Sequence, residues 1–79
     1  LPDQFVVLAG SFTTLDLAKH VQQRLYKKKI TAQIKKAHEQ DRVFFHVMIG
    51  PYRLAMQANN MVNTIRQETG ILAESTQIL

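Results

Sequence analysis

The sequence contains no cysteine, only six acidic residues and no long apolar run, and each absence narrows the possible functions. Without cysteine there is no disulfide framework and no thiolate metal site. No apolar run approaches the roughly 20 residues needed to cross a bilayer. No basic segment followed by an apolar one opens the chain, as it would in a signal peptide. We therefore expect a domain that meets a membrane only through segments outside this sequence.

The motifs of common catalytic and cofactor sites are missing too. His20, His38 and His46 are scattered and form no HxxxH pair. None of the acidic residues is placed as an obvious acid–base pair. Ser11 lies in AGSFT and not in a GxSxG elbow, and the single glycines do not make a phosphate-binding loop. We predict that the protein is not an enzyme and uses no metal or other cofactor.

What the chain does have is the composition of one small folded domain. Its 79 residues are 46% hydrophobic and 20% charged, which excludes disorder and allows one core layer. We expect residues 1–79 to be a single domain, and the abrupt start LPDQ suggests that it was cut from a longer protein. Residues 19–42 hold eight of the ten basic residues. The basic flank from Lys27 to Lys36 either faces a polyanionic partner or is the solvated end of a helix.

The two halves of the chain repeat each other at an offset of 40 residues. Each half gives an apolar strand, a glycine-centred turn and a helix, a unit that cannot bury its apolar face alone. Two copies should therefore form one pseudo-symmetric core. The matched residues are Phe5 with Phe45, Val7 with Val47, Gly10 with Gly50, Phe12 with Tyr52, Ala18 with Ala58, Val21 with Met61, and Leu25 with Ile65.

The patterns predict six elements in the order βαββαβ. We expect strands near residues 4–11, 31–37, 42–49 and 72–78, with GPY breaking the third strand. A first helix capped by Thr13 or Thr14 should end near residue 28, and a second should span 54–68 before Gly70. Its inward residues should be Ala55, Ala58, Met61, Val62 and Ile65. Short connections and right-handed crossovers make this an α+β, split βαβ fold. It has a four-stranded antiparallel sheet, the first and third strands central, and two helices on one face.

The opposite face of the sheet is left open, and strand alternation identifies its side chains. Phe45, Val47 and Ile49 should meet the helices, as should Phe5, Val7 and Ala9. The open face then carries an exposed, mostly apolar strip. Its residues are Val6, Leu8, Phe44, His46 and Met48. Such a strip is typical of a contact surface, unless a tail, a neighbouring domain or a dimer partner covers it.

The two half-motifs, FVVLAGSF…A…L and FHVMIGPY…A…I, resemble the sporulation-related repeat (SPOR) family from about Phe5 to Thr76. The resemblance implies a bacterial cell-envelope domain that binds peptidoglycan, usually at the C-terminus of a membrane-anchored or secreted division protein or wall hydrolase. Family members recognise glycan strands stripped of their stem peptides, which are enriched at the division septum. The implied location is the periplasm, and in the family the glycan lies on the exposed sheet face.

The resemblance also implies a glycan-binding set on this sequence. The Ser of the family's G-S-F motif is Ser11, and its third-strand aromatic is Phe44. The family's first-strand Gln falls at Leu8, its third-strand Arg at His46, and its Gly after the first helix at Lys29. Phe44 could stack on a sugar ring while Ser11 and His46 supply polar contacts. The expected glycan-binding residues are Val6, Leu8, Ser11, Phe44, His46 and Met48.

Two other functions fit the same fold. RNA-recognition domains share the βαββαβ order, but RVFFHVMI lacks their K/R-G-F/Y-G/A-F-V-x-F/Y run, so we expect no nucleic-acid partner. Alternatively, Val6, Leu8 and Met48 could seat a helix or strand of another protein, such as another division protein.

Overall fold

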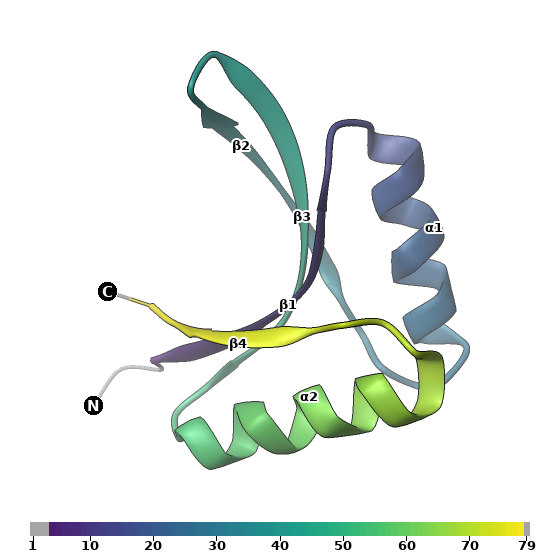
Figure 1. Ribbon diagram of the computed structural model, residues 1–79, viewed down its shortest axis with the longest axis vertical. Coiled ribbons are helices and arrows are strands. Elements are labelled where there is room, and N and C mark those ends of the chain that lie inside the picture. The colour runs from purple at the N-terminus through teal and green to yellow at the C-terminus, as the bar shows by residue number, and fades with distance from the viewer. Residues whose placement is uncertain (1–3, 79) are drawn as a thin grey trace.

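The computed structural model describes residues 4–78 and has the predicted α+β architecture. The sheet order is β2-β3-β1-β4, so the first and third strands are central, and all neighbours are antiparallel (Figure 1). The elements are β1 (Phe5–Phe12), α1 (Leu15–Tyr26), β2 (Gln33–Glu39), β3 (Arg42–Tyr52), α2 (Ala55–Thr69) and β4 (Glu74–Gln77). The fold class predicted from the sequence is therefore confirmed.

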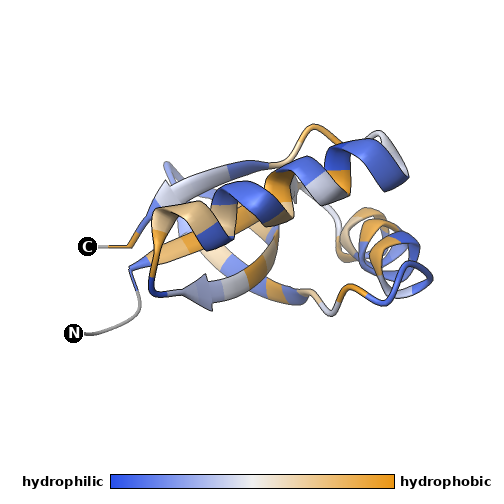
Figure 2. Ribbon diagram, turned by 90° about the horizontal axis from the view of Figure 1, so that it is seen from below, coloured by the Kyte–Doolittle hydropathy of each residue, from blue (hydrophilic) through white to orange (hydrophobic). Residues whose placement is uncertain are grey.

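Both helices are amphipathic and have defined ends (Figure 2). At the start of α1, the Leu17 backbone N–H donates to Thr14 Oγ1 at 3.3 Å, as expected of a hydroxyl cap. At the start of α2, the Gln57 side-chain oxygen accepts from the Leu54 backbone N–H at 3.2 Å. Gly70 ends α2 in the left-handed conformation, as predicted.

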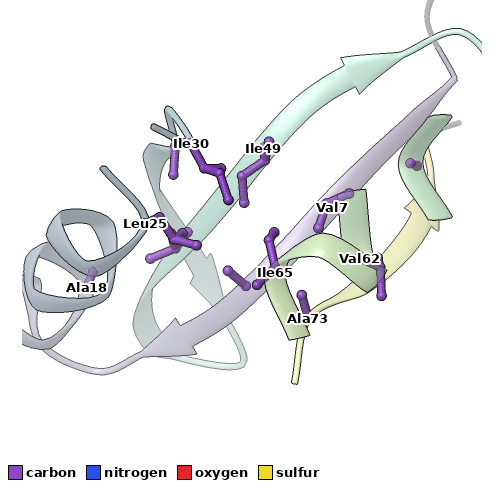
Figure 3. Close-up of a cluster of buried hydrophobic side chains, with 12 residues drawn as sticks. Val7, Ala18, Leu25, Ile30, Ile49, Val62, Ile65 and Ala73 are labelled. Atoms are coloured by element: carbon purple, nitrogen blue, oxygen red, sulfur yellow. The ribbon is translucent and has the colours of Figure 1, made fainter. Parts of the chain in front are cut away.

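The core lies between the helices and one face of the sheet and follows the internal repeat (Figure 3). Three repeat pairs contribute fully buried side chains: Val7 with Val47, Ala18 with Ala58, and Leu25 with Ile65. A further three pairs pack around them: Phe5 with Phe45, Phe12 with Tyr52, and Val21 with Met61. Partial burial raises the pKa of the Tyr52 hydroxyl above its usual value. Ala55 was predicted to face inward, but it is exposed in the first turn of α2.

The third strand does not end at Ile49 as predicted, but continues through a cis Gly50–Pro51 bond to Tyr52. The ladder with β1 shifts register here, because the four residues of β3 from Ile49 to Tyr52 oppose only three of β1, from Phe5 to Val7. Gly50 has φ 118°, and a side chain on it would approach the Tyr52 ring to 3.0 Å. Glycine at this position thus permits a bulge within a continuous strand.

A second bulge lies in β1 and decides which way Ser11 points. Leu8 pairs with Met48 while Gly10 pairs with Val47, so β1 carries one extra residue at this point. The shift resets the alternation, since Phe12 returns to the helix side and packs on the core. Ser11 consequently faces the open side with His46, its partner in the ladder.

Candidate functional site on the open sheet face

The sheet face opposite the helices, here called the outer face, carries the side chains that alternate with the core residues of each strand. The phase of β3 is as predicted, because Val47 and Ile49 are buried in the core whereas Phe44, His46 and Met48 are not part of it. The ladder pairs then place residues of the other strands on the same face. The outer face comprises Leu8, Ser11, Gln33, Lys35, Ala37, Glu39, Arg42, Phe44, His46, Met48 and Glu74.

His46 lies at the centre of a hydrogen-bonded chain that joins three strands. Its Nδ1 is 2.7 Å from Ser11 Oγ on β1, and its Nε2 is 3.1 Å from Glu39 Oε2 on β2. The His46 side chain is 18% exposed and that of Glu39 is 54% exposed. The imidazole is therefore held from both sides and still reaches the surface.

The partners of His46 determine where its proton lies when the ring is neutral. A carboxylate can only accept, so Nε2 carries the hydrogen and donates it to Glu39. Nδ1 then accepts from the Ser11 hydroxyl, which leaves the serine oxygen as an acceptor toward solvent. This hydrogen-bonded row of side chains thus presents an acceptor at each end, on Ser11 and on Glu39.

An aromatic surface adjoins this polar chain. The rings of Phe44 and His46 are stacked, with centroids 6.3 Å apart and planes 12° from parallel. Leu8 and Met48 are paired across the ladder and half-buried beside them. The outer face therefore combines flat apolar surface with fixed hydrogen-bonding groups, which suits a ligand that has both apolar faces and hydroxyl edges.

Five of the six predicted site residues reach this surface, and Val6 does not. Leu8, Phe44, His46 and Met48 are half-buried and Ser11 is exposed. Val6 lies outside the core cluster but is only 6% exposed. Val6 lies on the central strand β1 and is paired with Thr76 of β4. The prediction of Val6 as an exposed contact residue is corrected: its side chain offers almost no surface.

Glu39 is the site residue that the sequence did not reveal. The two-residue loop at Gln40 and Asp41 sets the ladder so that Glu39 pairs with Arg42, while Lys35 is the direct partner of His46. Glu39 reaches His46 because the β2–β3 hairpin is strongly curved (Figure 1). Between them on this face lies the small Ala37. Ladder register could be guessed from the sequence, but curvature of this kind could not.

The basic flank does not form one patch. Lys27, Lys28 and Lys29 follow α1 and are exposed. Lys35 faces outward opposite His46, whereas Lys36 is opposite Phe45 on the helix side. Only one lysine of the flank is therefore part of the outer face.

Across residues 4–78, no group of three or more His, Cys, Asp or Glu side chains could hold a metal ion. Over the same part of the chain, no helix is both long enough and apolar enough to span a bilayer.

Comparison with known proteins identifies the family of this chain. Residues 2–74 match the SPOR domain family. The chain belongs to the SPOR domain family. The family includes peptidoglycan-binding modules of the bacterial envelope, and that is the broad function to which this SPOR domain is assigned.

A solved structure supports the fold. The chain is similar to the crystal structure of the RlpA SPOR domain from Pseudomonas aeruginosa, with a TM-score of 0.73 and 18% sequence identity over 95% of this chain and 97% of the other. At this identity the likeness concerns the fold alone. No curated protein sequence matches the chain.

Proposed function

We propose that this SPOR domain binds peptidoglycan glycan strands that have lost their stem peptides, using the outer face and no catalysis. Through that binding it would direct its parent protein to the division septum, in the periplasm of a bacterium. The proposal rests above all on the fixed arrangement of Ser11, His46 and Glu39 beside the Phe44 ring. These groups need no large rearrangement to meet a ligand, which lowers the entropic cost of binding.

A glycan strand fits the chemistry of this face. The C–H faces of a sugar ring can pack on Phe44, and its hydroxyls can donate to Ser11 and to Glu39. Stem peptides project from alternate sugars, so a strand that carries them would collide with an open sheet. Selection of bare strands would then follow from shape alone.

The proposed contact residues are Leu8, Ser11, Phe44, His46 and Met48, now joined by Glu39. The family's polar residues at two of these positions are replaced by Leu8 and His46. In this protein the hydrogen-bonded row of Ser11, His46 and Glu39 would supply the polar contacts instead. The apolar seat for a partner protein is smaller than the sequence suggested, because Val6 is buried.

Sedimentation with purified sacculi tests the proposal. The 79-residue chain is incubated with sacculi before and after an amidase removes the stem peptides. We expect binding to rise strongly after amidase treatment, since more bare strand is exposed. Binding that does not rise would contradict the proposed ligand.

A pair of variants tests the location of the site. Phe44→Ala should weaken binding to amidase-treated sacculi about twofold to tenfold, the effect of losing about 0.5–1.5 kcal/mol of ring packing. Val43→Ala is the matched control, because Val43 is the neighbouring β3 residue, faces the helix side and is 37% exposed. Circular dichroism should show both variants folded. Equal binding by the two variants would show that the ligand lies elsewhere.

A further inference from the structure

We infer that Lys35 recognises the negative charge of the glycan. It would bind the carboxylate that remains on a muramic acid sugar once its stem peptide has been removed. The inference rests on the proposed function and adds to it a specificity-determining residue. Shape alone would select any bare polysaccharide of similar form. A cation at the site would select strands that carry carboxylates.

The position of Lys35 supports this role. It is the direct ladder partner of His46, the residue at the centre of the polar chain. Side chains paired across an antiparallel ladder have Cβ atoms about 4.5–5.5 Å apart. Lys35 therefore extends the transverse row formed by Ser11 on β1 and His46 on β3 to the edge strand β2.

The charges around Lys35 leave it available. Among residues 4–78 the one close contact between a basic side chain and a carboxylate is that of His46 with Glu39, so Lys35 is bound to no carboxylate of this part of the chain. Lys35 is exposed, and its ladder partner His46 already has both ring nitrogens occupied. An exposed ammonium group beside an aromatic and hydroxyl-bearing surface can donate hydrogen bonds to an anionic group of a ligand.

The chemistry of the bare strand supplies that anion. In an intact strand the lactyl side group of muramic acid is joined to the stem peptide through a neutral amide. Hydrolysis of this amide leaves a carboxylate on the sugar and releases the peptide as an amine. The strand thereby gains one negative charge at every second sugar. A lysine on the binding face would attract the bare strand by charge as well as admit it by shape.

Binding measurements with two ligands and two variants test the inference. The ligands are soluble amidase-treated glycan strands and the same strands after chemical reduction of their carboxyl groups to alcohols. Lys35→Gln should bind the unreduced strands, which keep their carboxylates, about two- to fivefold more weakly than wild type, as expected for one exposed ion pair. Wild type should lose a similar factor on the reduced strands. Lys35→Gln should then show no further loss on them, because the interacting pair is already broken.

Lys36→Gln is the matched control, since it removes the same charge from the adjacent residue on the other face. It should bind the carboxylate strands like wild type. The inference is overturned if Lys35→Gln binds like Lys36→Gln, or if wild type binds reduced and carboxylate strands equally. In either case the proposed glycan-binding function still stands. If wild type binds neither kind of strand, the proposed function itself fails.

Discussion

At the scale of single residues, the outer face depends on an aromatic ring that lies over a glycine. A Cβ built on Gly10 would lie 2.7 Å from the tip of the Phe12 ring. The ring cannot move aside freely, because it packs against the core. The same arrangement recurs at Gly50 and Tyr52 in the second half of the chain. The repeated glycine–x–aromatic motif therefore has a steric reason, and it accompanies the two bulges that set the faces of the central strands.

Gly10→Ala should lower the free energy of unfolding by about 1–3 kcal/mol, the usual cost of forcing extra volume into a packed site. Urea denaturation monitored by circular dichroism measures the change. Thr13→Ala is a suitable control, because Thr13 is exposed and the cap of α1 is Thr14. The control should change stability by no more than about 0.5 kcal/mol. Equal midpoints for both variants would show that the ring is free to move.

At the scale of elements, the β2–β3 hairpin carries both Glu39 and Lys35 to the site. Its two loop residues, Gln40 and Asp41, have φ values of 50° and 63°. Two positive φ angles in a two-residue hairpin loop are the geometry that Asn-Gly prefers. Gln40 in particular occupies a conformation that is costly for a residue with a long side chain.

Replacing the loop by Gln40→Asn with Asp41→Gly should raise the free energy of unfolding by about 0.5–1 kcal/mol, as left-handed strain is relieved. Thermal or urea denaturation gives the stability, and sedimentation with amidase-treated sacculi gives the binding. Binding should stay the same, because Glu39 and Lys35 are retained. A less stable double variant would mean that the native side chains make contacts that outweigh the strain.

Most of the elements could be predicted from the sequence because they follow from periodicity. The helical stripe of Ala18 and Leu25 and the two-residue alternation of β3 both appear where expected. The bulges could not be predicted in this way, since alternation continued through Gly10 would have turned Ser11 toward the helices. The contact of Glu39 with His46 could not be predicted either, because the two residues are not partners in the β2–β3 ladder.

At the scale of the whole molecule, two similar halves form one layer of helices and one sheet. Only one face of the sheet packs against the helices. The core is shared almost equally between the repeats, as the fully buried Leu25 and Ile65 illustrate. The outer face is not symmetric in the same way. Ser11 of the first half corresponds to Pro51 of the second, and His46 corresponds to Val6. The repeat therefore builds a common scaffold, while the residues proposed to bind glycan differ between its halves.

The central claim is that a bare glycan strand binds the outer face, and nuclear magnetic resonance tests it most directly. Uniformly ¹⁵N-labelled chain is titrated with soluble amidase-treated glycan strands, and the shift of each backbone amide is followed. We predict that the largest changes occur at Ser11, His46 and Met48 of the central strands, with small changes along α1 and α2. Changes concentrated on the helices, or no changes at all at concentrations that saturate binding to sacculi, would contradict the proposed site.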